Sequence, residues 1–241
     1  MNIALLESFH GAISLLYPPL CEICREKIGH ADYLCSKCLT NAPRIKSPFC
    51  ATCSEPFDGA ITETFSCANC AHRKLYFECA VASYRSRGLV RKIVHDFKYG
   101  QQIHLRFPIA DWLGETLDDP RLHGRRFDIV VPVPLHPTRK RERGFNQAEL
   151  LAELFCARAS LTMRPVLQRI RYTTTQTVFD RAERMENLRD AFCLRKKMDV
   201  RGLRVLLIDD VLTTGSTLSE CARVLKQAGA LFVHAATAAR A

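Results

Sequence analysis

Eight cysteines near the N-terminus have the types and spacing of metal ligands. They form four C-x-x-C pairs: Cys21 with Cys24, Cys35 with Cys38, Cys50 with Cys53, and Cys67 with Cys70. A two-residue gap lets two thiolates face one Zn²⁺ at about 2.3 Å, and structural zinc takes four such ligands in a tetrahedron. The eight residues therefore predict two closed, structural zinc sites. Sequential pairing is the simplest arrangement, and crossed pairing also agrees with the spacing.

Disulfides and redox chemistry are the other uses open to these cysteines. A disulfide framework needs an oxidising compartment, whereas the first 19 residues lack the basic region and cleavage site of a signal peptide. The segments between the pairs are short and turn-rich, so metal binding would supply the folding free energy that a small core cannot. Four further cysteines stand alone in apolar surroundings and are expected in the core: Cys79, Cys156, Cys193 and Cys221.

A second candidate site follows a strand-like apolar run over 203–208. Two acids come next, Asp209 and Asp210, and then a hydroxyl-rich loop: Thr213, Thr214, Gly215, Ser216 and Thr217. Hydroxyls, backbone N–H groups and a helix N-terminus favour a phosphate, and glycine lets the backbone approach it. The carboxylates can accept hydrogen bonds from a ribose diol or help hold hydrated Mg²⁺. The pattern predicts a sugar phosphate site, with a simple strand–helix connection as the structural alternative.

The elements that must position these residues alternate from residue 79 onward. Apolar runs predict strands over 79–84, 127–133, 203–208 and 230–236. Helical periodicity predicts helices over 89–99, ending at Gly100, and over 105–117, 147–158 and 218–228. This alternation predicts an α/β fold, a parallel sheet with helices on both faces. Ligands of such sheets bind beyond the carboxyl ends of the strands, here after Val133 and after Ile208.

Charge divides the 241 residues near residue 78. Residues 1–78 hold 7 Lys and Arg against 8 Asp and Glu, whereas residues 79–241 hold 28 against 17. We therefore expect two domains, 1–78 and 79–241. The basic residues include a compact group that is either a solvated face or a site for phosphates or nucleic acid: Arg139, Lys140, Arg141, Arg143, Arg169, Arg171, Arg181 and Arg184.

The N-terminal residues predict an amphipathic helix that ends before Pro18 and Pro19. Its apolar side chains recur at helical spacing: Ile3, Leu6, Phe9, Ile13 and Leu16. The run is shorter than the roughly 20 apolar residues of a membrane span. Packing on its own protein is the expected role, and binding flat on a membrane surface is the alternative. Without a span or a signal peptide, a cytoplasmic location is expected.

Residues 205–218 resemble the phosphoribosyl pyrophosphate (PRPP) motif of type I phosphoribosyltransferases, and the whole chain resembles the ComF family, which includes ComFC-type and GntX-type proteins. The resemblance covers nearly all of the chain. Its further motifs are Leu-Tyr-Pro-Pro at 16–19, Phe-Lys-Tyr-Gly at 97–100, Val-Pro-Val-Pro-Leu at 131–135, Arg-Gly-Phe-Asn-Gln at 143–147, Arg171 with Thr175 and Gln176, Arg184 with Asn187, and Ala191 with Phe192.

The resemblance implies a preceding double zinc ribbon and a domain that binds PRPP with Mg²⁺. Asp209 and Asp210 would contact the ribose hydroxyls, and residues 213–217 would hold the 5′-phosphate. The loop after Val133 would receive the pyrophosphate, with Lys98 near the same anion. Residues 171–187 would form a hood over the substrate. The arginines expected to neutralise the departing pyrophosphate are Arg139, Arg143, Arg171 and Arg184.

The implied function is phosphoribosyl transfer to an unknown acceptor, linked to DNA uptake and natural transformation. Thr213 stands where purine-salvage enzymes of this fold carry an acid, which argues against a hypoxanthine or guanine acceptor. One alternative is a non-catalytic protein that binds single-stranded DNA, with Phe145, Tyr172 and Phe179 either stacking on bases or packing internally. A second is a regulator that only senses PRPP. The zinc ribbon would dock a DNA-processing protein or serve as a folded appendage.

Overall fold

The computed structural model describes residues 18–29, 32–59, 65–172 and 188–241. The chain forms two compact units, Met1–Ala42 and Pro43–Ala241. The smaller unit holds the first cysteine group, and the larger holds the second together with the sheet. The expected helix before Pro18, and Arg181 and Arg184 of the expected hood, lie outside the described residues. The expected domain boundary near residue 78 stays a prediction.

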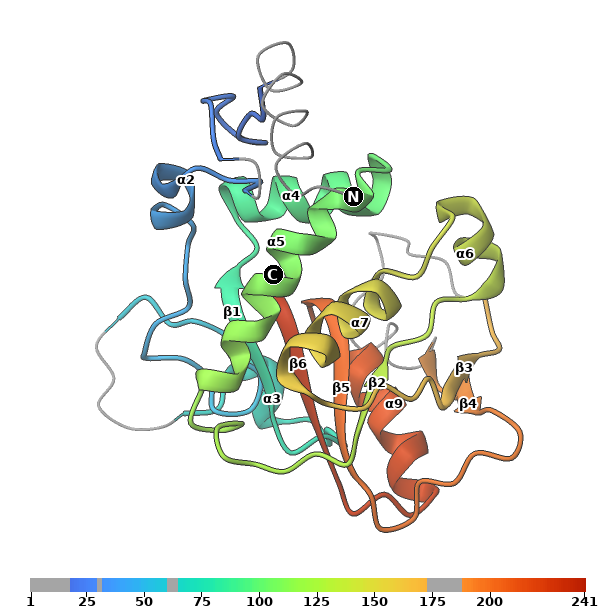
Figure 1. Ribbon diagram of the computed structural model, residues 1–241. Helices are drawn as coiled ribbons and strands as arrows, with labels where there is room; N and C mark the ends of the chain where they lie inside the picture. The colour runs from blue at the N-terminus through green and yellow to red at the C-terminus, as the bar shows by residue number, and fades with distance from the viewer. Residues whose placement is uncertain (1–17, 30–31, 60–64, 173–187) are drawn as a thin grey trace. The chain divides into compact units, whose positions relative to one another are not determined.

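A four-stranded parallel sheet is the centre of the larger unit (Figure 1). Its order is β1-β6-β5-β2, and every neighbouring pair runs parallel. In the middle, Val205 lies opposite both Val233 and Ile129. The predicted parallel α/β sheet is thus confirmed. The strands are β1 (Ala80–Arg85), β2 (Ile129–Pro132), β5 (Arg204–Leu212) and β6 (Phe232–Arg240).

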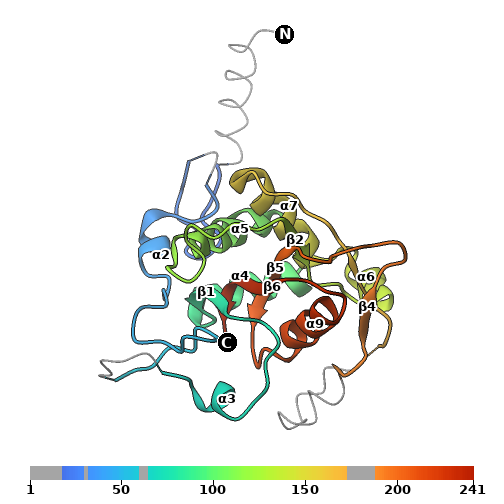
Figure 2. The same cartoon turned by 90° about the horizontal axis from the view of Figure 1, so that it is seen from below.

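Helices cover both faces of this sheet. Helices α5 and α7 pack on each other and on one face, whereas α9 lies on the other (Figure 2). The predicted stretch 105–117 is not one helix, because α5 ends at Gly114, a residue that disfavours helix, and a 3₁₀ turn follows. The elements are α4 (Gly88–Tyr99), η1 (Ile103–Leu105), α5 (Arg106–Gly114), η2 (Glu115–Asp118), α7 (Gln147–Ala159) and α9 (Ser216–Gln227).

Several short elements in the larger unit were not predicted, among them α6, β3 and β4. Helix α6 (Pro137–Arg143) begins with a proline at its first turn and ends at Gly144, whose φ of 83° is left-handed. Strands β3 (Leu167–Arg169) and β4 (Phe192–Leu194) form a separate antiparallel pair. The helical turns of the two cysteine groups, α2 (Ser36–Thr40) and α3 (Ala68–Ala71), complete the labelled elements.

Strand β5 runs four residues further than predicted. It pairs with β6 through Asp209 opposite Thr237, and continues to Leu212 opposite Arg240. The prediction that the strand ends at Ile208 was therefore wrong: β6 extends to Arg240 and keeps β5 paired beyond the acids. Both acids therefore lie within the strand.

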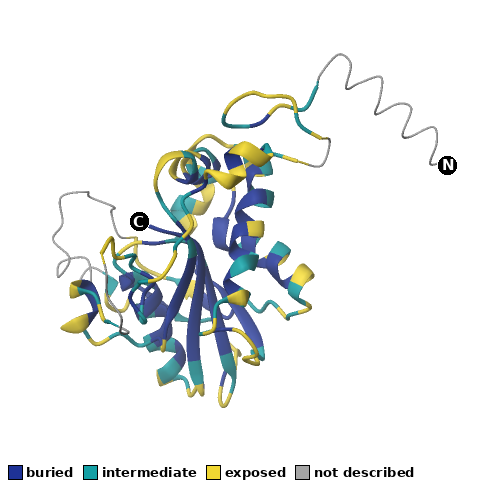
Figure 3. Cartoon of the chain, turned by 90° about the vertical axis from the view of Figure 1, so that its left-hand side faces the viewer, coloured by how far each residue is buried: buried dark blue, intermediate teal, exposed yellow. Residues whose placement is uncertain are grey.

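The core of the larger unit includes the second cysteine group. Side chains of β5, β6 and α9 share one buried cluster with Cys50, Cys70 and Phe77. The strands are buried along most of their length, as their dark blue colour shows (Figure 3). The second group is thus packed on the α9 face of the sheet. Within the described parts of the chain, no helix has the length and apolar character to cross a membrane.

Candidate phosphate site and cysteine groups

The cysteines form two groups of four. In each group the sulfur atoms lie within 4.8 Å of one another: Cys21, Cys24, Cys35 and Cys38, then Cys50, Cys53, Cys67 and Cys70. The 3.6 Å between the sulfurs of Cys24 and Cys35 is close to the edge of about 3.8 Å that 2.3 Å metal bonds give a tetrahedron. All twelve cysteines are free thiols, and the pairing is sequential. Both donor sets fit a structural zinc ion.

Backbone N–H groups turn toward the sulfurs in both groups. Cys35 donates its N–H to the sulfur of Cys21 over 3.4 Å, and Cys67 donates to the sulfur of Cys50 over 3.3 Å. Such bonds favour the thiolate, the form that binds a metal. The first group therefore repeats in the second with the same internal geometry, even though the two belong to different compact units.

Lys98 and the two acids meet at the carboxyl end of β5. The ammonium of Lys98, in the last turn of α4, lies 2.9 Å from Oδ1 of the buried Asp210. Burial alone lowers the pKa of Lys98, but the charges of Asp210 and Asp209 outweigh it and raise this pKa. For Asp209, burial and the charge of Asp210 raise the pKa to about 7. The site thus holds one fixed ion pair and one carboxyl that titrates near neutrality.

The hydroxyl-rich loop follows directly and begins α9. Gly215 has a left-handed φ of 76° and is the N-cap residue of this helix. The hydroxyl of Thr214 lies 2.9 Å from that of Ser216, and Thr213 is exposed. The helix N-terminus adds its partial positive charge to these donors. The loop therefore places hydroxyls at the start of α9, and its binding of a phosphate stays a prediction.

A basic pocket of about 290 Å³ opens beside Lys98. It is bordered by the ends of α4 and α6 and by the residue Tyr172 that follows β3. Arg143 stacks over Tyr99 and Arg139 over Tyr172, with guanidinium carbons 4.9 Å and 5.5 Å from the ring centroids. Its lining residues are Lys98, Tyr99, Gln101, Arg139, Glu142, Arg143 and Tyr172.

Two other arginines of the basic group, Arg169 and Arg171, differ in their contacts. Arg169 acts electrostatically on Asp209 and lowers its pKa, while burial and the charge of Arg139 lower the pKa of Arg169 itself. Arg171 instead donates to the carbonyl oxygen of Arg189 over 2.9 Å and does not line the pocket. Arg169 was predicted as part of the basic group but not as a site residue.

The Arg-Gly-Phe-Asn-Gln motif shapes the loop after β2. The Asn146 side chain caps α7 and also donates to the carbonyl of Val133 over 3.1 Å. Phe145 is buried against Phe97, with ring centroids 5.3 Å apart. Phe145 is therefore a core residue and cannot offer its face to a nucleobase, whereas Tyr172 is 48% exposed.

Two residues at this site were not predicted. Asn69 and Arg73, from the second cysteine group, both donate to the carbonyl oxygen of Thr214, over 3.2 Å and 3.0 Å. Arg73 also donates to the hydroxyl of Ser216 over 3.0 Å. The only sequence signal was their position next to Cys70, which does not reveal a contact with a loop so distant along the chain.

Comparison with known proteins agrees with this architecture. Residues 12–71 match a double zinc ribbon domain and residues 142–241 a phosphoribosyl transferase domain. The DNA utilization protein YhgH of Salmonella typhimurium is 32% identical over 228 residues, covering 91% of this chain and 96% of the relative. Competence protein F of Haemophilus influenzae is 30% identical, with 87% and 91% covered. ComFC of Bacillus subtilis is 24% identical, with 82% and 80% covered.

These matches define a phosphoribosyltransferase-fold protein that carries a double zinc ribbon. The chain belongs to the ComF family. Among solved structures, an adenine phosphoribosyltransferase from Thermoanaerobacter pseudethanolicus is 17% identical, with a TM-score of 0.36, over 56% of this chain and 68% of that structure.

Proposed function

We propose that the chain binds PRPP with Mg²⁺ and transfers the phosphoribosyl group to an acceptor, in the service of DNA use by the cell. This proposal is based on the chemical groups that lie at the carboxyl end of β5. Lys98 forms an ion pair with Asp210, and Asp209 accepts a hydrogen bond from the N–H of Asp210. The loop at the start of α9 offers hydroxyls and a helix N-terminus. Carboxylates for a diol, next to donors for a phosphate, match a ribose 5-phosphate. The relatives' names supply the link to DNA.

Each part of the substrate has a counterpart among these residues. Asp209 and Asp210 accept hydrogen bonds from the ribose hydroxyls, and residues 213–217 hold the 5′-phosphate. The pocket with Arg139 and Arg143 takes the pyrophosphate. When the bond from C1 to pyrophosphate breaks, the leaving oxygen keeps the electron pair, and the acceptor forms its bond to C1. The arginines stabilise the growing negative charge.

The carboxyl pair also suits a divalent cation. Mg²⁺ prefers oxygen ligands, keeps several waters and is held by one or two carboxylates together with substrate phosphates. Asp209 meets this description, because Asp210 already pairs with Lys98. When bound, the ion neutralises the pyrophosphate. The zinc ions that we propose for the two cysteine groups are structural, and their thiolates need a reducing compartment, which favours the cytoplasm.

Isothermal titration of PRPP and Mg²⁺ into the zinc-loaded chain tests this proposal. We expect saturable binding that is lost when Asp209→Asn and Asp210→Asn are combined. Absence of binding by the wild-type chain, or equal binding by the double variant, would falsify the proposal. Pyrophosphate release in the presence of candidate acceptors then separates a transferase from a sensor, because a sensor binds PRPP and releases none.

A second candidate function is binding of single-stranded DNA at the basic pocket. The specific observation is a pair of exposed tyrosines, Tyr99 at 65% and Tyr172 at 48%, each beside an arginine. Exposed rings next to cations are the elements that stack bases and attract phosphates. Because we assign the same pocket to the pyrophosphate, DNA and PRPP would compete for it.

A further inference from the structure

The second cysteine group and the phosphate loop are joined by a set of short hydrogen bonds. Asn69 donates to the Thr214 carbonyl, and Arg73 donates both to that carbonyl and to the Ser216 hydroxyl. Arg73 is itself oriented by the amide oxygen of Asn69, which accepts from it over 2.8 Å. Two donors on one carbonyl hold the peptide group of Thr214 in a single orientation.

The orientation of the Thr214 peptide group decides which groups of the loop can donate hydrogen bonds to an anion. A trans peptide points its C=O and the following N–H in opposite directions. With the Thr214 carbonyl drawn to Asn69 and Arg73, the N–H of Gly215 points away from them. Arg73 also donates to the Ser216 oxygen, and because that oxygen lies 2.9 Å from the Thr214 hydroxyl, one of these two hydroxyls keeps a proton that it can donate. The contacts therefore leave the Gly215 N–H and one hydroxyl as donors.

The backbone that carries Asn69 and Arg73 is fixed next to the cysteines of the second group. Asn69 lies between the ligand positions Cys67 and Cys70, in the single turn of α3, and Arg73 donates its N–H to the carbonyl of Cys70 over 3.3 Å. Further along, the N–H of Tyr76 donates to the hydroxyl of Ser219 in α9 over 3.2 Å. A metal that closes the four thiolates would hold the backbone from which both side chains reach the loop.

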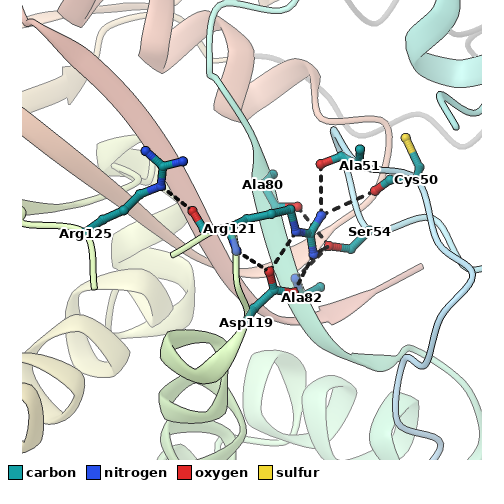
Figure 4. Close-up of polar contacts among 8 residues, drawn as sticks. All are labelled: Cys50, Ala51, Ser54, Ala80, Ala82, Asp119, Arg121 and Arg125. Carbon is teal, nitrogen blue, oxygen red and sulfur yellow. Dashed lines mark hydrogen bonds and ion pairs between the residues drawn. The ribbon is translucent and has the colours of Figure 1, made fainter. Parts of the chain in front are cut away.

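The other end of the group is anchored on the sheet (Figure 4). Arg121 donates to the carbonyl oxygens of Cys50 and Ala51 and to the Ser54 hydroxyl. That hydroxyl donates to the Ala80 carbonyl over 3.0 Å. The second group is thus held by β1 on one side and holds the phosphate loop on the other.

We propose that Arg73 and Asn69 are positioning residues of the phosphate loop, so that phosphate-ester binding by this chain depends on an intact second cysteine group and not on the first. The proposal rests on the proposed function, because it assigns the loop to a phosphate. The metal ion proposed for the second cysteine group would then take no part in the reaction, but it would control the structure of the substrate site. The side chains act through Thr214 and Ser216.

The test uses the zinc-loaded full chain with ribose 5-phosphate and with PRPP and Mg²⁺. We expect Arg73→Gln to weaken both by about tenfold or more, and to speed amide hydrogen exchange in residues 213–219. Lys74→Gln removes the same charge one residue further on and is expected to change neither. Arg73→Lys keeps the charge but not the two-pronged geometry, so it should stay weak. Wild-type affinity in Arg73→Gln, or full recovery in Arg73→Lys, overturns the proposal.

The metal dependence is read in the same two assays. Cys67→Ser should speed exchange in the loop and weaken binding, whereas Cys35→Ser in the first group should do neither. Equal effects of the two cysteine changes overturn the dependence on the second group. If Cys67→Ser does not fold, Arg73→Gln still decides. If the wild-type chain binds no phosphate ester, the proposed function fails, and the exchange rates alone still show whether Arg73 controls the loop.

Discussion

The ammonium of Lys98 lies 2.9 Å from a carboxylate oxygen of Asp210, which joins the last turn of α4 to the end of β5. The side chains are 22% and 6% exposed, so the pair is largely withdrawn from water. Breaking such a pair leaves one buried charge without a partner. This contact therefore contributes to stability and also orients the acid that we assign to the ribose.

Lys98→Met tests this contact. We expect a loss of roughly 3 kcal/mol in the free energy of unfolding, together with loss of PRPP binding. Lys92→Met on the same helix is the matched control, because Lys92 pairs with Asp96 at an exposed position and should cost less than about 1 kcal/mol. Denaturant titration and calorimetry measure the two effects. Equal losses in the two variants would contradict the assignment.

Asp209 and Asp210 should respond to the same substitution with opposite signs. The pKa of Asp209 is raised to about 7, from an ordinary value of 3.8. Its protonated form therefore stabilises the fold at low pH, and that contribution is lost as pH rises between these two values. At about pH 8, Asp209→Asn should raise the free energy of unfolding by on the order of 4 kcal/mol, whereas Asp210→Asn should lower it by leaving Lys98 unpaired.

The measurement is denaturant unfolding of both variants and the wild type under matched conditions. The advantage of Asp209→Asn should shrink toward about pH 5.5, where the wild-type carboxyl is mostly protonated. A gain that is independent of pH would contradict the shifted pKa. By the same reasoning, PRPP affinity of the wild type should fall as pH drops below about 7, because a protonated Asp209 accepts fewer hydrogen bonds.

Gly215→Ala tests the role of the loop, and Gly202→Ala is the matched control. Both have a left-handed φ, 76° and 71°, and an added Cβ would meet nothing closer than 3.5 Å at Gly215 and nothing within 4 Å at Gly202. Alanine should therefore cost about 1–2 kcal/mol of stability at each position, from backbone strain alone. Only Gly215→Ala should weaken binding of ribose 5-phosphate. Comparable weakening in Gly202→Ala would show a global effect and not a local one.

Two zinc ions per chain are expected, one in each four-cysteine group. Because pairing is sequential, changing Cys21, Cys24, Cys35 and Cys38 together to serine should leave one ion. Crossed pairing would instead leave none, because each site would lose two of its four ligands. Elemental analysis gives the count, and cobalt substitution reports tetrahedral thiolate coordination through visible absorption. We expect the variant to keep one ion and to show the same cobalt absorption per bound ion as the wild type.

Single-stranded DNA binding should depend on salt and on the pocket. Removing Arg139 and Arg143 should lower the salt slope by about 0.7 for each phosphate that they neutralise, and Tyr99→Ala or Tyr172→Ala should weaken binding by about 1–3 kcal/mol per stacked base. Arg201→Ala, just before β5 at its amino end, is the control. Affinity that hardly changes with salt would exclude an electrostatic site.

Much of the fold could be predicted because it rests on local patterns. The runs that form β1, β2, β5 and β6 are apolar and short, and the helices between them carry a clear period. Strands β3 and β4, with three residues each, are too short to show a period. The end of β5 depended on pairing with β6, which no local pattern contains.

The candidate site divides in the same way. Asp209, Asp210 and the loop are contiguous in sequence, so their proximity was predictable. Family resemblance placed Lys98 near the pyrophosphate, and its ion pair with Asp210 was not predicted. Asn69 and Arg73 were not expected, because their contact with Thr214 depends on how the second cysteine group packs on α9.

The anchoring of Ser54 and Arg121 has a consequence for how this protein can evolve and be engineered. Cys50, Cys70 and Phe77 share a core with α9, and Arg73 donates to the Ser216 hydroxyl, so we expect the side chains of this half of the ribbon to be matched to α9 and to Ser216. A chimera that takes both halves of the ribbon from a relative would import side chains unmatched to the resident loop. A crossover at Pro43, where the compact units divide, would exchange the first half and keep this network within one parent.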